Sequence, residues 1–360
     1  MNLHRSPPST AIPRRGFLEL ALGTAAYGAF GSVLAGAQAS SQRPAFKTRG
    51  VVLIPEDFTW TDWPDRAAKA GLTTVALHHG RSVFEVIKFV NSDAGKRFLR
   101  RARSLGLQVE YELHAMNELL PRWRFDQDKS LFRMNEQGER VRDYNLCVHS
   151  PQALEIMAEN AVAVGRLLRP TTGRYFYWGD DGRPWCRCPK CREFTDTEQA
   201  LLLENHLVLA LRRLEPKAQL AHLAYANTLA APVKVKPQPG IFLEYAPIHR
   251  NYEQPYASQT GGKDALDNLD ANLKVFPADT AQVLEYWLDV SRFSGWKRPA
   301  NKLPWRGDVF LSDLDTYGSR GIRHVTSFAC YIDADYVKRY GEPAGLGEYG
   351  AGLRGRPVRE

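Results

Sequence analysis

The feature that most constrains the fold of this 360-residue chain is an alternation of short apolar segments with longer amphipathic stretches. The short segments are rich in the β-branched and aromatic residues that favour strands. They are residues 51–54, 73–78, 107–114, 174–178, 220–225, 241–245, 283–287 and 322–328. Helical periodicity is clearest at residues 94–105, 151–168, 197–214 and 264–276. This alternation predicts an α/β fold in which eight parallel strands close into a (β/α)8 TIM-like barrel.

Two connections depart from the alternation. Pro232, Pro237 and Pro239 stand where a helix would join the fifth and sixth strands, and a long insert at residues 117–145 follows the third strand. We find no internal repeat. We expect the barrel to occupy residues 40–340. The Gly- and Arg-rich residues 341–360 are expected to form a flexible C-terminal tail.

The first 39 residues have the composition of an export signal. Pro-Arg-Arg-Gly-Phe-Leu at residues 13–18 resembles a twin-arginine motif, and an Ala-, Gly- and Leu-rich run then leads to Ala37-Gln38-Ala39, a small-x-small cleavage site. A buried helix or a membrane anchor is the alternative, but the run lacks the block of ~20 strongly apolar residues that a span requires. We therefore predict a twin-arginine (Tat) signal peptide at residues 1–39. The mature protein would be periplasmic or secreted, would meet the Tat translocase during export and would keep no stable membrane anchor.

Net charge and aromatic content limit the classes of molecule that the protein is expected to bind. The formal net charge is +8, spread without long basic runs, so we expect no nucleic acid to bind. The chain contains eight Trp, fifteen Tyr and sixteen Phe, and aromatic rings stack on the flat apolar faces of sugars, although many will be core. A mild positive field could attract an anionic glycan such as a uronate, although solvated surface lysines and arginines are the favoured explanation.

Polar residues gather where the predicted strands end. In a (β/α)8 barrel the chemistry lies at the C-terminal ends of the strands. Because several strands end in this way, we predict that a single site brings the side chains together. The residues are His78, His79, Glu112, His114, Asp180, Asp181, Tyr225, Asn227, Glu244 and Glu285.

Cysteines form a second cluster. Cys186, Cys188 and Cys191 make a C-x-C-x-x-C run after the fourth strand, and Cys147 could complete a set of four. Four thiolates would form a closed structural zinc site, which twin-arginine export of a folded protein would allow to be loaded first. Two disulfides are the alternative in an oxidising compartment. His149 is a weaker candidate ligand, and Cys330 is expected to be a buried free thiol.

These residues carry a family likeness. The stretch from Asn145-Leu146-Cys147 through Gly179-Asp180-Asp181-Gly182 and the C-x-C-x-x-C run to Ala224-Tyr225 resembles an uncharacterised bacterial barrel family, catalogued as a domain of unknown function. That family pairs a "DG" after strand four with such a loop, and it is similar to the α-glucuronidase and β-hexosaminidase group of glycoside hydrolases. The likeness covers roughly residues 50–335. It implies a glycan-directed barrel that acts as a hydrolase with a carbohydrate substrate.

The resemblance also implies roles for the carboxyl groups. Related barrels place the general acid at the end of strand four, which gives Asp180 or Asp181. We prefer Asp181 because it shares strand parity with Tyr175 and Tyr177. Glycosidases need a second carboxylate, for which Glu244 and Glu285 are the candidates. Asp289 is expected at the rim of the site, four residues beyond Glu285.

Other side chains are candidate substrate ligands. Trp178, Tyr245 and Trp287 could stack on sugar rings, with barrel core as the alternative. Arg250 could grip a substrate carboxylate.

Two other functions remain open. The barrel could bind a glycan without catalysis. Alternatively, His78, His79, Glu112 and His114 could hold a catalytic metal, although no fixed metal-binding spacing is present.

Overall fold

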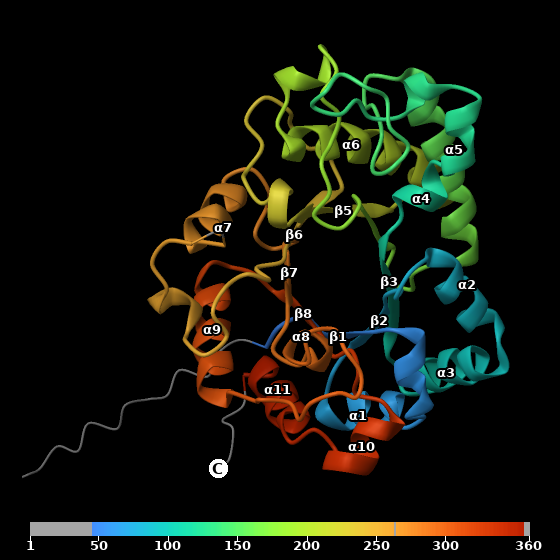
Figure 1. Cartoon of the computed structure of the whole chain (residues 1–360). Helices are drawn as coiled ribbons and strands as arrows, with labels where there is room; N and C mark the ends of the chain where they lie inside the picture. The colour runs from blue at the N-terminus through green and yellow to red at the C-terminus, as the bar shows by residue number, and fades with distance from the viewer. Residues whose placement is uncertain (1–44, 263, 356–360) are drawn as a thin grey trace, which may run out of the picture. The chain divides into compact units, whose positions relative to one another are not determined.

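The computed structural model describes residues 45–262 and 264–355, so the predicted signal peptide lies outside the described residues. Eight parallel strands close into a barrel in the order β1 to β8, as predicted (Figure 1). β1 pairs with both β2 and β8, which closes the ring. The strands are β1 (Thr48–Leu53), β2 (Thr74–Leu77), β3 (Gln108–His114), β4 (Arg174–Trp178), β5 (Gln219–Ala224), β6 (Ile241–Tyr245), β7 (Gln282–Glu285) and β8 (His324–Phe328).

Helices surround the strand ring; α3, α5, α6 and α9 are clear examples (Figure 1). The α-helices are α1 (Trp63–Ala70), α2 (Val83–Asn91), α3 (Asp93–Ser104), α4 (Met116–Leu119), α5 (Pro151–Leu167), α6 (Asp196–Leu214), α7 (Leu266–Leu273), α8 (Val290–Phe293), α9 (Gly307–Ser319), α10 (Ala334–Tyr340) and α11 (Gly345–Leu353). The four helices expected from periodicity correspond to α3, α5, α6 and α7. The proline-rich β5–β6 connection contains the short 3₁₀ helix Ala226–Thr228 and no α-helix.

Local sequence explains where the two long helices begin. At α6, the Thr195 hydroxyl accepts a hydrogen bond from the backbone amide of Glu198, and the Glu198 carboxylate accepts one from the amide of Thr195. This capping box satisfies amides that have no partner within the helix. At α5, Ser150 caps the amide of Ala153 and Pro151 takes the first position, where a missing N–H costs nothing. Both helices follow segments that supply site residues, so these caps fix where those segments end.

The interior of the barrel contains a buried polar layer. Arg174 on β4 stacks on the Phe242 ring at 3.8 Å and donates to Gln282, and the Gln282 amide in turn donates to Glu244 at 3.0 Å. Glu110, Glu112 and Glu244 are all fully buried in this layer, and burial raises the pKa of each carboxyl group. A layer of buried groups that can take up a proton therefore forms the floor of the candidate site.

The C-terminal segment differs from its prediction. Residues 345–353 form α11, and its Leu346, Tyr349 and Leu353 are buried against the barrel, where we predicted a flexible tail. Tyr349 donates its hydroxyl to the carbonyl of Gly50 on β1, which anchors the helix. The glycines that suggested disorder instead permit close packing: a Cβ at Gly350 would lie 1.9 Å from the carbonyl oxygen of Ala70. Among the described residues, no helix combines the length and apolar character needed to cross a membrane.

Candidate active site

A cavity of about 330 Å³ opens at the C-terminal ends of the strands. Every strand contributes side chains from its end or from the loop that follows it; from β1 the contribution is Ile54, directly after its last residue. The polar and aromatic lining residues are His78, His79, His114, Trp178, Asp181, Tyr225, Tyr286, Asp289, Ser291, Trp296, Phe328, Cys330 and Tyr331. The cavity is therefore where a barrel of this kind places its chemistry.

Two carboxyl groups line the cavity. Asp181 follows β4, is exposed, and accepts a hydrogen bond from the Tyr225 hydroxyl at 2.9 Å. Asp289 follows β7 and is only 4% exposed. Its Oδ1 accepts hydrogen bonds from the amide of Ser291 at 3.1 Å and from the Ser291 hydroxyl at 2.6 Å. Burial raises the pKa of Asp289 to about 6, against the opposing effect of these hydrogen bonds.

Asp180 holds the loop in place and lies outside this cavity. Its carboxylate accepts from the guanidinium of Arg122 at 3.0 Å and from the backbone amide of Asn145 at 2.6 Å. The Asn145 side chain makes a second hydrogen bond to the same residue, because its Oδ1 accepts from the backbone amide of Asp180 at 2.9 Å. Asp180 thus joins the β4 loop to the insert that follows β3.

Glu244, predicted as the second carboxylate, does not line the cavity. It points into the barrel beneath Trp178, whose indole Nε1 donates to it at 2.7 Å. Burial raises the pKa of Glu244 to about 8. The prediction is right about the side of the sheet, but the structure places Glu244 one layer deeper than the cavity lining, because Trp178 covers it.

Glu285 also lies elsewhere, on the outer side of the barrel. It forms an ion pair with Arg250 at 3.1 Å and accepts hydrogen bonds from the hydroxyls of Tyr252 and of Tyr317 on α9. Arg250, predicted to grip a substrate carboxylate, has a 1% exposed side chain that also pairs with Asp313 of α9. Alternation along β7 explains the error, since Gln282 and Leu284 point inward and Glu285 must point outward.

The aromatic predictions divide in the same way. Trp178 lines the cavity, whereas Tyr245 is buried with its hydroxyl on Tyr256, and Trp287 donates its indole N–H to Asp313. Sequence reasoning missed Trp296, which lines the cavity with a 63% exposed side chain.

Trp296 and Tyr331 share an unusual backbone conformation. Trp296 has φ +55° and Tyr331 has φ +71°, in a left-handed region that bulky residues rarely adopt. Both line the cavity, and their local sequence gives no warning of this geometry. Strained residues of this kind are often found at functional sites.

The three predicted histidines come together in the cavity, and two other candidates do not join them. His78 and His114 ring centroids lie 5.7 Å apart, and His78 and His79 stack at 4.7 Å. Glu112 is buried in the barrel interior, where Gln282 donates to it at 3.4 Å. Asn227 donates to Asp196 at 2.7 Å outside the cavity. In the described part of the chain these residues form no cluster with metal-ligand spacing, so the predicted catalytic metal site is not assembled.

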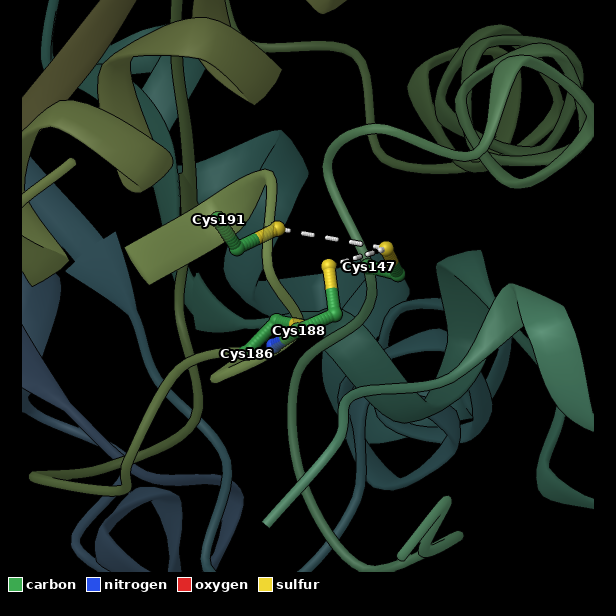
Figure 2. A group of neighbouring side chains, drawn as sticks. All are labelled: Cys147, Cys186, Cys188 and Cys191. Atoms are coloured by element: carbon green, nitrogen blue, oxygen red, sulfur yellow. Dashed lines mark hydrogen bonds between the residues drawn. The ribbon is translucent and has the colours of Figure 1, made fainter. Parts of the chain in front are cut away.

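The four predicted cysteines do form such a cluster. The sulfurs of Cys147, Cys186, Cys188 and Cys191 all lie within 4.8 Å of one another, and all four residues are buried (Figure 2). Cys147 is 3.8 Å from Cys188 and 3.9 Å from Cys191. All are free thiols, as is the buried Cys330.

Polar hydrogens surround the cysteine sulfurs. The amide of Met134 donates to Cys186 at 3.3 Å, and the amide of Cys188 lies 3.5 Å from the same sulfur. The ring Nδ1 of His149 is 3.2 Å from the sulfur of Cys191. These contacts suit sulfurs that carry negative charge, as metal-bound thiolates do. The cluster is compatible with a structural metal.

The fold and the cavity together define a (β/α)8-barrel protein with an acidic, aromatic-lined site at the C-terminal ends of its strands. Residues 36–295 match the family described as Domain of unknown function (DUF4838). The chain belongs to this family. No curated protein sequence matches the chain.

Solved structures of glycoside hydrolases share the fold. A GH5 (subfamily 4) endo-β-1,4-glucanase from Bacillus licheniformis, in complex with cellotetraose, has a TM-score of 0.51 and 12% identity over 88% of this chain and 60% of that one. A catalytic mutant of Gan42B, a GH42 β-galactosidase from G. stearothermophilus, has a TM-score of 0.51 and 13% identity over 86% and 56%. A β-galactosidase from Rahnella sp. R3 has a TM-score of 0.51 and 12% identity over 87% and 56%. This chain spans 56–60% of each of these proteins.

Proposed function

We propose that this protein is a glycoside hydrolase that cleaves a glycan with the carboxyl groups of Asp181 and Asp289. The observation that carries the proposal is that these two acids, supplied from β4 and β7, line one cavity at the C-terminal ends of the strands. Most glycosidases need two carboxyl groups that flank the scissile bond. The glycoside-hydrolase fold of the structural neighbours adds support by analogy.

The two environments favour different roles. Asp289 is buried and its pKa is raised to about 6, so it retains a proton closer to neutral pH than an ordinary aspartate does. We assign Asp289 as the general acid, whereas the sequence predicts Asp181 in that role. The Asp289 proton passes to the glycosidic oxygen as the bond from that oxygen to the anomeric carbon breaks.

Asp181 supplies the second function. Its carboxylate either bonds to the anomeric carbon or takes a proton from the attacking water, depending on the separation of the two carboxyl groups. The Tyr225 hydroxyl holds the Asp181 carboxylate in one orientation by a 2.9 Å hydrogen bond. Tyr225 is thus a positioning residue for Asp181.

A substrate screen tests the proposal. Purified protein is incubated with aryl glycosides of neutral sugars, aryl α-glucuronides, N-acetyl-β-hexosaminides and polysaccharides. The α-glucuronides and the N-acetyl-β-hexosaminides test the kinship with α-glucuronidases and β-hexosaminidases that the sequence implies. We expect sugar release that Asp181→Asn abolishes, while the matched exposed variant Asp308→Asn on α9 retains it. Binding without release would reject the enzyme proposal for that ligand and favour a glycan-binding barrel.

We also propose that the cysteine cluster holds a structural Zn²⁺. Four thiolates placed tetrahedrally ~2.3 Å from zinc lie ~3.8 Å from one another, close to the 3.8 Å and 3.9 Å separations of Cys147 from Cys188 and Cys191. A disulfide needs sulfurs ~2.05 Å apart. With all four positions taken by protein, the ion would hold the β4 loop against the preceding insert and would take no part in the reaction.

Metal analysis tests the zinc assignment. We expect one zinc per chain, and Co²⁺ in its place should give the intense absorption of thiolate-to-metal charge transfer. Two disulfides detected by mass spectrometry in metal-free protein would contradict the assignment.

Export by the twin-arginine pathway is a third proposal, and it rests on the sequence of residues 1–39 alone. Fusing these residues to a reporter should deliver it to the periplasm. Replacing Arg14 and Arg15 together by Lys should stop delivery, and unchanged delivery would reject the twin-arginine route.

A further inference from the structure

In the part of the chain that the structure describes, the cavity lining contains acids and imidazoles but no side chain that is always positively charged. Among its lining residues in the described chain there is no lysine or arginine. Three arginines of neighbouring loops are paired elsewhere: Arg122 with Asp180, Arg250 with Glu285 and Asp313, and Arg298 with Asp333. A substrate carboxylate would therefore meet Asp181 and Asp289 without a cationic side chain in the lining to pair with.

The contacts of the histidines fix which nitrogen carries the proton. His78 Nδ1 lies 2.5 Å from the carbonyl oxygen of Glu112, and His114 Nδ1 lies 2.6 Å from that of Gly179. A carbonyl oxygen only accepts hydrogen bonds, so each Nδ1 must be the donor. In a neutral ring, Nε2 then carries a lone pair. Neither Nε2 has a hydrogen-bond partner within the described residues.

His79 has the opposite tautomer, and its lone pair does not face the cavity. Its Nε2 donates to the carbonyl of His114 at 3.2 Å, so Nδ1 carries the lone pair, and that buried atom has no partner in the described structure. Burial, together with the neighbouring histidines, lowers the pKa of His78 well below its usual value and that of His79 to about 4. His78 and His114 therefore line one wall of the cavity with hydrogen-bond acceptors.

Such a wall discriminates between sugars by charge. A neutral pyranose offers hydroxyl groups, each of which can donate to an imidazole lone pair. The carboxylate of a uronate has only acceptor atoms, which would face the lone pairs of the wall and the negative charge of Asp181. Rejection would thus come from an unfavourable contact as well as from a missing favourable one.

We propose that the cavity selects an uncharged pyranoside through hydroxyl contacts to His78 and His114, and rejects the corresponding uronate. The inference rests on the proposed function, because it takes the cavity as the sugar site. It replaces the sequence-based idea of an anionic substrate, which relied on a mild positive charge and on Arg250. That arginine is buried in an ion pair outside the cavity.

Binding of free monosaccharides tests the selectivity independently of catalysis. Glucose, galactose and mannose are compared with glucuronate and galacturonate by calorimetry on the wild-type protein. These probes have no glycosidic bond, so failure of the hydrolase proposal would not affect the result. We expect at least one neutral sugar to bind about tenfold or more tightly than its uronate. Equal or tighter uronate binding, or no binding of any neutral sugar, would overturn the inference.

Two variants test the histidine wall itself. His114→Phe and His78→Phe retain an aromatic ring but remove the acceptor, and each should weaken neutral-sugar binding about fivefold to tenfold. His114→Gln should restore part of the loss, because its amide can place an oxygen near the position of Nε2. His206→Phe on α6, outside the cavity, is the control, and circular dichroism checks folding. Full affinity in both folded Phe variants would overturn the role of the wall.

Discussion

Tyr225, directly after β5, donates its hydroxyl to the carboxylate of Asp181, which follows β4, at 2.9 Å. This hydrogen bond joins neighbouring strand ends across the mouth of the barrel. It fixes one face of an exposed carboxylate that would otherwise rotate freely, which is how a positioning residue contributes to catalysis.

Removing that hydroxyl should slow catalysis more than it weakens binding. For Tyr225→Phe we expect kcat to fall about tenfold with a smaller change in KM, because the substrate can still enter the cavity. Tyr245→Phe is the matched control. It removes a buried hydroxyl outside the cavity and should lower stability by about 1 kcal/mol while leaving kcat unchanged. Equal kcat values for both variants would contradict the positioning role of Tyr225 in catalysis.

The pKa of Asp289 predicts the alkaline limb of the pH–rate profile. A general acid must be protonated, so activity should fall as the pH rises through about 6. The hydrogen bonds from Ser291 lower this pKa, and Ser291→Ala removes the one made by its hydroxyl. We therefore expect Ser291→Ala to move the alkaline limb to higher pH. A limb that stays in place would contradict the assignment of Asp289 as the acid.

The buried Glu244 predicts how stability depends on pH. Its pKa is raised by burial from 4.5 to about 8, so the folded state binds this proton more tightly than the unfolded state. The resulting stability is fully present below pH 4.5 and is lost as the pH rises through 8. The free energy of unfolding should fall by about 2 kcal/mol or more between pH 5 and pH 9 from this group.

Glu244→Gln tests that dependence, because its side chain does not titrate. We expect a flatter profile of unfolding free energy against pH, measured with urea at each pH. Glu155→Gln, an exposed position on α5, should keep the wild-type slope. Identical slopes in all three proteins would place the responsible group elsewhere.

Trp296 should act as a stacking platform for the substrate. Trp296→Gly removes a 63% exposed ring and suits the φ of +55°, so KM should rise about fivefold to tenfold without loss of stability. Trp123→Ala, at a 57% exposed tryptophan that does not line the cavity, should leave KM for a small aryl glycoside unchanged. A drop in thermal stability with an unchanged KM for Trp296→Gly would show a structural role.

Removal of the metal should make the loop after β4, which carries Asp180 and Asp181, more mobile. Cys147 lies two residues from Asn145, which holds Asp180 at 2.6 Å. A chelator, or Cys188→Ser, should therefore lower Tm and increase hydrogen exchange at residues 179–191. Cys330→Ser, at a buried thiol outside the cluster, should leave exchange in that segment unchanged. Protection of the segment in metal-free protein would contradict the proposed role of zinc.

Residue spacing was enough to predict the barrel and the cysteine cluster, because both depend on patterns along the chain. Alternating segments fix strand order in a barrel, and C-x-C-x-x-C places three thiols within reach of one ion. The side of the sheet was harder to assign. Asp181 was chosen by parity with Tyr175 and Tyr177, yet Tyr177 bonds the carbonyl of Ala161 on α5 and faces the helices. Asp181 reaches the cavity because the chain turns after β4.

Residue types alone could not predict how far a side chain lies beneath the cavity lining or how the chain turns after a strand. Glu244 faces inward, but Trp178 covers it, and nothing local distinguishes a floor residue from a lining one. Asp289 was expected at the rim because four residues of strand would carry it ~13 Å beyond Glu285. β7 ends at Glu285, and the chain then folds into α8, which returns Asp289 to the cavity.

The central claim is that Asp181 and Asp289 together cleave a glycosidic bond. Its most direct test is kcat/KM for Asp181→Asn, Asp289→Asn and Asp308→Asn on a glycoside that the wild type hydrolyses. We predict losses of about a hundredfold or more for the first two variants, with sugar binding retained, and no loss for the third. Hydrolysis that survives either of the first two substitutions would contradict the account.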